Sequence, residues 1–155
     1  MDNKALMELP LFERALTLAS VRHAGQKDKG GAPYVMHVIR VMMGVNSSDE
    51  KLAALLHDLL EDTETTEKEL LEYGFAPHTV ELVKLLSRAE NEDYMDYIRR
   101  LSVEKSAVLI KLSDLKDNKD RTRQKEKLDK EDIERLKKYH RAEEFLLEVL
   151  HGHSI

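Results

Sequence analysis

The chain has 155 residues, of which 41% are hydrophobic, and this is typical of one globular domain with its own core. Its 25 basic and 30 acidic residues are well mixed and give a formal net charge of −5, which argues against nucleic acid as the principal partner. The absence of cysteine excludes disulfides, thiolate metal sites and cysteine nucleophiles, and no apolar run approaches the roughly 20 residues of a membrane span. We therefore expect a single cytoplasmic domain over residues 1–155 that has neither nucleic acid nor a membrane as its partner.

The first part of the chain predicts two helices joined by a loop. Apolar residues recur at helical spacing from Pro10 until Gly25, and His23 lies at the end of that run. Two glycines and a proline among charged residues predict a loop over residues 26–33. Residues 34–43 are mostly apolar and are followed by a glycine, which predicts a short second helix.

Two capping boxes mark the starts of the next two helices. Ser47 with Glu50 opens the helix that carries the segment 53–63, and Thr66 with Glu69 opens the helix after it. In such a box the first side chain accepts from the backbone N–H three residues on, and the glutamate accepts from the backbone N–H of the first residue. Both helix starts are therefore defined by the sequence.

Three helical segments follow in the middle of the chain. Pro77 begins an apolar segment, Asn91 is expected to cap a helix over residues 92–101, and residues 103–118 form the third segment. We predict a helix rather than a strand for residues 103–118, because its polar residues fall three and four apart and the chain offers no second strand for pairing.

The last part of the chain predicts a connection and one long helix. Residues 121–127 contain no apolar residue, which is typical of a mobile connection. Residues 129–150 carry apolar side chains along one face of a long helix. The periodicity therefore predicts an all-α protein, a bundle of about seven or eight helices.

An apolar segment near the centre, AALLHDLLEDT (53–63), contains the pairs His57-Asp58 and Glu61-Asp62. Charge inside an apolar helical run costs free energy unless it has a partner or a function. The two pairs are separated by about one helical turn, so a continuous helix would present all four side chains on one flank. The segment therefore predicts a functional site on a helix that otherwise packs into the core.

Two further candidates for this site are His23, at a helix end, and Asp114, within an apolar helix. With the His-Asp pair of the central segment they offer two imidazoles and two carboxylates, a donor set suited to Mn²⁺, Fe²⁺, Co²⁺ or Zn²⁺ rather than to Ca²⁺ or Mg²⁺. A bound ion with open positions would lower the pKa of water enough to yield a nucleophile near neutral pH. Glu61 and Asp62, one turn on, would then orient the water or carry its proton.

The residues alone leave other interpretations open. A histidine at a helix C-terminus, such as His23, is favoured there by the helix dipole without binding anything. Asp114 and Asn118 fit the start of a C-terminal cap, although an aspartate inside an apolar helix is costly enough to favour a ligand. Lys29 fits a solvated loop, and His37 fits a core or helix-face residue. Spacing does not show that His23 and Asp114 reach the central segment.

A resemblance to a known family rests on four segments in chain order, namely HAGQ (23–26), PY (33–34), LLHDLLEDT (55–63) and KLSDLKDN (111–118). Together they resemble the HD-domain phosphohydrolases, specifically the alarmone hydrolases of the RelA/SpoT type and their small single-domain relatives. The resemblance implies an all-α HD-domain bundle, Mn²⁺ as the metal, and a small phosphorylated nucleotide as the partner. The implied reaction is removal of pyrophosphate from the 3′ position of guanosine tetra- or pentaphosphate.

The resemblance also implies a role for each matching residue. The implied metal ligands are His23, His57, Asp58 and Asp114. The implied catalytic pair is Glu61 and Asp62. Asn118 would lie against the sugar of the nucleotide, and Lys29 matches a family lysine that would meet phosphate.

The chain departs from the family pattern at two places. The family carries Arg-Lys after the first segment, where this chain has Asp28-Lys29, and an acidic side chain cannot stack on a base as a planar cation does. The family's histidine-proline is His37-Val38 here. Two alternatives therefore stay open, a 5′-nucleotidase or broader nucleotide phosphatase and, in another class, a non-catalytic nucleotide-binding module. The intact Glu61-Asp62 pair argues against the module.

Overall fold

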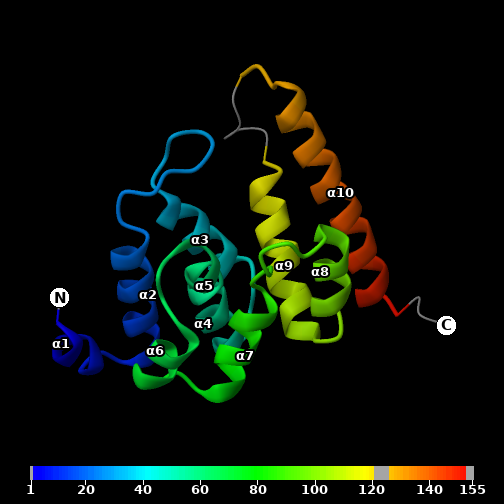
Figure 1. Ribbon diagram of the computed structural model, residues 1–155. Coiled ribbons are helices and arrows are strands. Elements are labelled where there is room, and N and C mark those ends of the chain that lie inside the picture. The colour runs from blue at the N-terminus through cyan, green and yellow to red at the C-terminus, as the bar shows by residue number, and fades with distance from the viewer. Residues whose placement is uncertain (1, 121–125, 153–155) are drawn as a thin grey trace.

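The computed structural model describes residues 2–120 and 126–152, and these residues form an all-α bundle (Figure 1). The first helices are α1 (Asn3–Met7), α2 (Leu11–Arg22), α3 (Tyr34–Met43), α4 (Ser48–Leu56) and α5 (Leu59–Asp62). The others are α6 (Glu67–Glu72), α7 (Pro77–Leu85), α8 (Tyr94–Leu101), α9 (Lys105–Asn118) and α10 (Lys130–Leu150). Within the described ranges no strand forms, although an isolated bridge joins Lys27 to Pro33. The predicted all-α class is confirmed, with more and shorter helices than expected.

The two predicted capping boxes are confirmed, whereas α8 and α9 each begin two residues later than predicted. Both capping boxes form, with the side chain of Ser47 at the start of α4 and that of Thr66 at the start of α6. The expected cap at Asn91 is wrong, because Asp93 caps α8 and its side chain accepts from the backbone N–H of Asp96. Asn91 instead has a left-handed backbone, with φ of 87°, in the turn before the helix.

The sequence led us to expect one continuous helix through the central polar segment. The structure instead divides it into two helices. α4 ends at Leu56 and α5 begins at Leu59, so His57 and Asp58 lie in a break between them. The ring Nδ1 and the backbone N–H of His57 lie 2.6 and 3.4 Å from the carbonyl oxygen of Ala54. In a continuous helix that carbonyl would accept from the N–H of Asp58, so the side chain of His57 competes with the helical hydrogen bond.

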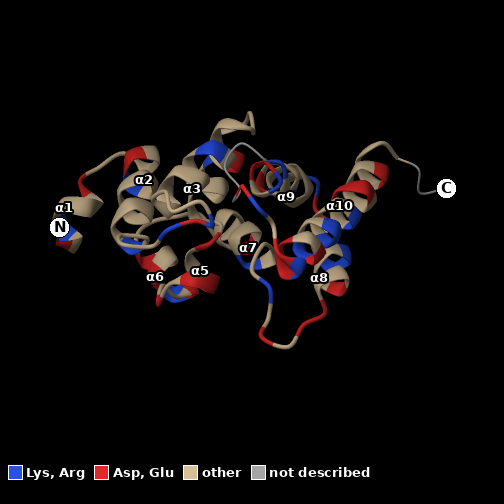
Figure 2. Cartoon of the chain, turned by 90° about the horizontal axis from the view of Figure 1, so that it is seen from above, with Lys and Arg blue, Asp and Glu red and all other residues tan. Residues whose placement is uncertain are grey.

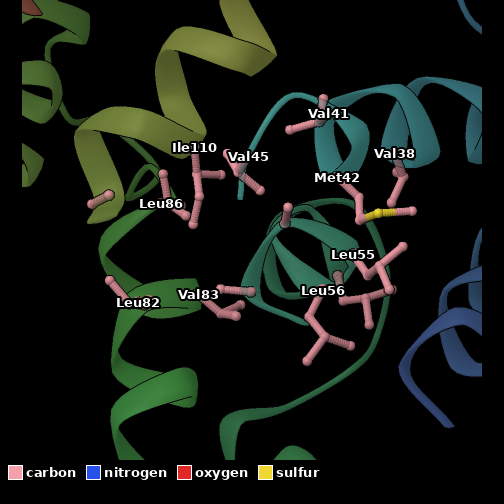
Figure 3. Close-up of a cluster of buried hydrophobic side chains, with 14 of the residues drawn as sticks. Val38, Val41, Met42, Val45, Leu55, Leu56, Leu82, Val83, Leu86 and Ile110 are labelled. Atoms are coloured by element: carbon pink, nitrogen blue, oxygen red, sulfur yellow. The ribbon is translucent and has the colours of Figure 1, made fainter. Parts of the chain in front are cut away.

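The core fixes the position of this break. α4 packs against α2, α3, α7 and α9, while α9 also packs against α10 (Figure 1). Figure 3 shows Leu55 and Leu56 of α4 in one cluster with Met42 of α3, Val83 of α7 and Ile110 of α9, and all five side chains are buried. Because close-packed side chains leave little room for movement, the residues that follow α4 are held firmly against α3 and α9.

No helix of the described ranges combines the length and the apolarity that crossing a lipid bilayer requires.

The connection predicted over residues 121–127 falls mostly on residues 121–125, which lie outside the described residues.

Candidate metal centre and active site

Four buried side chains from three parts of the fold meet at one point, namely His37 on α3, His57 and Asp58 in the break after α4, and Asp114 on α9. One ligand atom of each lies within 4.8 Å of the other three. Nε2 of His57 is 3.0 Å from Oδ2 of Asp58 and 3.3 Å from Oδ1 of Asp114. Nε2 of His37 is 2.9 Å from the same oxygen of Asp114. Two imidazoles and two carboxylates facing one point form a donor set that fits a divalent transition metal.

Both histidines of this group direct Nε2 toward the carboxylates of the group. Nδ1 of His57 lies 2.6 Å from the carbonyl oxygen of Ala54, and Nδ1 of His37 lies 2.6 Å from Oδ2 of Asp117. Because a carbonyl or carboxylate oxygen can only accept, Nδ1 carries the proton in each ring and donates it. The lone pair of a neutral ring is then on Nε2, which is the atom a metal would bind.

The charges of the group stabilise one another when no cation is present. Burial lowers the pKa of His37, but hydrogen bonds to Asp114 and Asp117 outweigh burial and raise the pKa to about 9. Burial likewise opposes protonation of His57, yet the charge of Asp58 and further carboxylate contacts raise its pKa well above the ordinary value. A proton on Nε2 occupies the place that a metal ion would take, so protons and metal compete for these rings.

Lys111 and Asn118, on the same helix as Asp114, each contact one oxygen of its carboxylate. Nζ of Lys111 lies 2.8 Å from Oδ2 of Asp114, and Nδ2 of Asn118 donates to Oδ1 at 3.3 Å. Burial raises the pKa of Asp114, but the charge of Lys111 and the imidazoles outweigh it and hold this pKa well below its ordinary value. Asp114 is therefore ionised, with one oxygen held by the lysine and the other turned toward the imidazoles.

The acidic pair on α5 lies beside the cluster and is exposed to the cavity. One ligand atom each of Asp58, Glu61 and Asp62 lies within 4.8 Å of the others. Burial and the charge of Asp58 raise the pKa of Asp62 to about 6, and burial also raises the pKa of Glu61. Oε1 of Glu61 accepts from the backbone N–H of Arg88 at 2.8 Å. A carboxyl group whose pKa is near 6 can take up and return a proton close to neutral pH, as general acid-base catalysis requires.

His23 lies near the group of ligand atoms without belonging to it. Its Nδ1 is 2.8 Å from Oε1 of Gln26, whose amide donates to the backbone oxygen of Asp62 at 3.0 Å. Its Nε2 is buried and has no hydrogen-bond partner among the described residues. The residue expected as a ligand thus connects the end of α2 to the end of α5, next to the acidic pair.

His37 stands in the place that the sequence assigned to His23. It is buried on α3, as are Val38 and Val41, and we interpreted it from the sequence as a core or helix-face residue. One signal could have found it: a polar side chain inside an apolar helix needs a partner, which is the argument that identified Asp114. The structure brings together three of the four expected ligands and adds His37 to them.

The cluster opens into a cavity of about 800 Å³. Its lining includes Asn118 and, in the loop between α2 and α3, Lys29. A cationic wall of the same cavity consists of cationic and aromatic side chains that the sequence did not single out, namely Arg88, Tyr94, Arg135, Lys138 and Tyr139. Figure 2 shows the basic residues spaced along α10, which supplies part of this wall. Nothing in the spacing of single helices indicates that these side chains share a cavity with the His-Asp cluster, because they come from α8, α10 and the segment before α8.

Cations and aromatic rings alternate in that wall. Nζ of Lys138 lies 4.5 Å from the ring centroid of Tyr94 and 5.7 Å from that of Tyr139, and the guanidinium of Arg88 lies 5.6 Å from the Tyr94 ring. The hydroxyl of Tyr94 is buried and has no hydrogen-bond partner within the described ranges. A ligand with several anionic groups and a planar ring would therefore find both kinds of contact on this side of the cavity.

Comparison with known proteins gives three findings. Residues 15–139 match the family model of the HD domain. The chain is 34% identical over 119 residues to the guanosine-3′,5′-bis(diphosphate) 3′-pyrophosphohydrolase of Aquifex aeolicus, and the match covers 69% of this chain and 17% of that protein. It is 31% identical over 124 residues to a GTP pyrophosphokinase of Myxococcus xanthus, covering 69% of this chain and 16% of that protein. The chain thus spans only a small part of the length of these relatives.

A solved structure has the same fold. It is described as a metazoan ortholog of SpoT that hydrolyzes ppGpp, and it superposes with a TM-score of 0.73 at 24% sequence identity. The superposition covers 94% of this chain and 97% of that one.

Proposed function

The chain belongs to the HD-domain family, and from this premise we propose that it is a metal-dependent phosphohydrolase that removes the 3′-pyrophosphate from guanosine tetra- or pentaphosphate. The observation that carries the proposal is the convergence of two imidazoles and two carboxylates beside an acidic pair, in a cavity that also has the cationic wall. The name of the Aquifex aeolicus relative and the activity stated for the structural relative support this substrate class.

We propose His37, His57, Asp58 and Asp114 as the metal ligands, and Mn²⁺ as the metal. The four side chains are buried, and each points a nitrogen or a carboxylate oxygen at the same place. When bound, the ion would supply Lewis-acid activation of water and of the phosphoryl group. This set replaces His23 of the sequence-based prediction with His37.

Glu61 and Asp62 would handle the proton of the reaction. A water molecule attacks the phosphorus bonded to the 3′ oxygen, the bond from phosphorus to that oxygen breaks, and the products are the 5′-phosphorylated nucleoside and pyrophosphate. The proton lost by the water goes to one carboxylate of the pair, and the 3′ oxygen gains a proton as it leaves. The pKa of Asp62, raised to about 6, suits this exchange.

The cationic side chains would neutralise the phosphate groups of the substrate. Lys29 lines the cavity from the loop between α2 and α3, while Arg88, Arg135 and Lys138 belong to the cationic wall. Asn118, one turn after Asp114 on α9, would contact the sugar, as the resemblance implies. Charge-assisted hydrogen bonds of this kind are about twice as strong as neutral ones, so the wall would contribute mainly to affinity.

The proposal is tested by measuring pyrophosphate and phosphate release with Mn²⁺ from guanosine tetraphosphate, guanosine pentaphosphate and nucleoside 5′-monophosphates. We expect release of pyrophosphate from the two alarmones alone. Release of phosphate from the monophosphates would favour the 5′-nucleotidase. Mn²⁺ binding without turnover of any substrate would favour the nucleotide-binding module.

A further inference from the structure

The outer nitrogen of His37 is held by a carboxylate that the proposed reaction does not use. Asp117 lies one turn after Asp114 on α9, and its Oδ2 is 2.6 Å from Nδ1 of His37. A histidine that donates Nδ1–H to a carboxylate keeps its lone pair on Nε2 and is a more basic ligand. Asp117 thus stands behind His37, on the side away from the proposed metal.

Arg40 in turn holds Asp117. Its Nε lies 2.6 Å from Oδ1 of Asp117 and its NH2 lies 3.3 Å from Oδ2, so the guanidinium contacts both carboxylate oxygens. Burial raises the pKa of Asp117, but the hydrogen bonds from His37 and Arg40 outweigh burial and lower the pKa. Asp117 is therefore an ionised acceptor whose position is fixed at two points. Since Arg40 follows His37 by one turn of α3, both contacts join α3 to α9.

The same guanidinium lies beside the loop that carries Lys29. Oδ1 of Asp28 accepts from the backbone N–H groups of Gly30 and Ala32 at 2.9 Å each, which closes the loop on itself. Its Oδ2 lies 4.0 Å from NH2 of Arg40. Asp28, which stands where the family carries arginine, is therefore engaged with its own loop and with α3. The 4.0 Å contact is long and part-exposed, so we expect it to contribute less than the contacts to Asp117.

We propose that Asp117 and Arg40 are positioning residues that hold His37 in the orientation and tautomer needed for metal binding. This inference rests on the proposed function, because it requires His37 to be a ligand. It adds that the ligand depends on a carboxylate-guanidinium pair between α3 and α9, and that the loop with Lys29 is attached to the same pair through Asp28.

The inference is tested by titrating Mn²⁺ calorimetrically into chelator-treated protein. Asp117→Asn should weaken Mn²⁺ binding about 10- to 100-fold, as expected for loss of the partner of a ligating histidine. Arg40→Gln should weaken it in the same direction by a smaller factor, because the carboxylate remains without its clamp. Since the two residues act through one another, the double variant should bind Mn²⁺ within about twofold of Asp117→Asn alone.

Arg100→Gln is the matched control. Arg100 makes an equivalent two-point contact with a carboxylate, since its Nε and NH2 lie 2.9 and 3.0 Å from the two oxygens of Glu92, and neither residue touches His37. We expect this variant to bind Mn²⁺ as the wild type does. The side chain of Arg40 is 30% exposed and that of Asp117 is 10% exposed, so we expect Arg40→Gln to lose less stability than Asp117→Asn. Thermal unfolding of all three variants measures this loss.

Proton NMR of the Zn²⁺-loaded protein gives a second readout that a purely structural role would not change. The Nδ1–H of His37, strongly hydrogen-bonded to Asp117, should give a slowly exchanging downfield resonance that Asp117→Asn removes and Arg100→Gln keeps. Mn²⁺ affinities of both Asp117→Asn and Arg40→Gln within about twofold of the control would overturn the inference. A wild-type protein that binds no Mn²⁺ would overturn the proposed metal centre itself, and the inference with it.

Discussion

The two sides of the cavity are built in different ways. On one side, His37, His57, Asp58 and Asp114 are at most 7% exposed, and each contacts another member of the group. On the other side, the cations of the wall are partly or fully exposed, and two of them, Arg88 and Lys138, contact the face of the Tyr94 ring. The buried side fixes which chemistry is possible because its groups cannot reorient. The exposed side can change without disturbing the fold, so it adjusts affinity and selectivity.

The largest expected effect is a loss of turnover without a loss of metal binding. Glu61→Gln should lower kcat for pyrophosphate release about 10²- to 10⁴-fold, the usual contribution of a positioned acid or base. Mn²⁺ affinity, measured by calorimetry, should stay near that of the wild type. Glu64→Gln makes the same change at an exposed neighbouring position and should retain full activity. Loss of Mn²⁺ binding in Glu61→Gln would mean that Glu61 is a ligand rather than a proton carrier.

The second prediction concerns the core beneath the buried side. Leu56 is fully buried at the end of α4, so Leu56→Ala should lower the free energy of unfolding by about 2–5 kcal/mol in urea titrations. Leu71 is 46% exposed on α6, and Leu71→Ala should cost about 1 kcal/mol or less. Equal losses in the two variants would contradict the placement of Leu56 in the core.

The third prediction concerns the pH dependence of Mn²⁺ binding on the buried side. Because the pKa of His37 is raised to about 9 in the metal-free protein, a proton must leave before the ring can bind metal. Raising the pH from 7 to 9 should therefore tighten Mn²⁺ binding, by about tenfold per pH unit for each proton displaced. The proton release can be counted by calorimetry in buffers of different ionisation enthalpy. An affinity that does not change over this range would contradict the protonated state assigned to the rings.

The smallest expected effect falls on the exposed side. Lys138→Ala should raise KM for the alarmone about tenfold through the loss of one charge-assisted contact, with kcat and Mn²⁺ affinity unchanged. Lys137, its neighbour on α10, does not line the cavity, so Lys137→Ala should leave KM unchanged. A fall in kcat with constant KM in Lys138→Ala would instead place this side chain at the reacting phosphate.

The sequence predicted most of the site because most of its signal is local. The two pairs of the central segment stand within six residues of one another in an apolar run, and Asp114 breaks the apolar pattern of its own helix. The capping boxes of α4 and α6 are also local, and both form. Each of these features needs only the helical repeat and the cost of buried charge to be recognised.

The features that the sequence did not reveal depend on side-chain contacts that helical periodicity does not encode. His37 looks like a core residue until α9 brings Asp114 and Asp117 against it. The break between α4 and α5 forms because the ring of His57 contacts a backbone carbonyl, which a periodic pattern cannot show. The cationic wall combines residues separated by about a third of the chain, and no spacing rule joins Arg88 to Lys138.

The most direct test of the account is a crystal structure of the Mn²⁺-bound protein with an anomalous difference map. The account predicts one strong peak surrounded by Nε2 of His37, Nε2 of His57 and carboxylate oxygens of Asp58 and Asp114, with the acidic pair of α5 alongside. A peak bound by His23 in place of His37, or no peak between α3, α4 and α9, would contradict it.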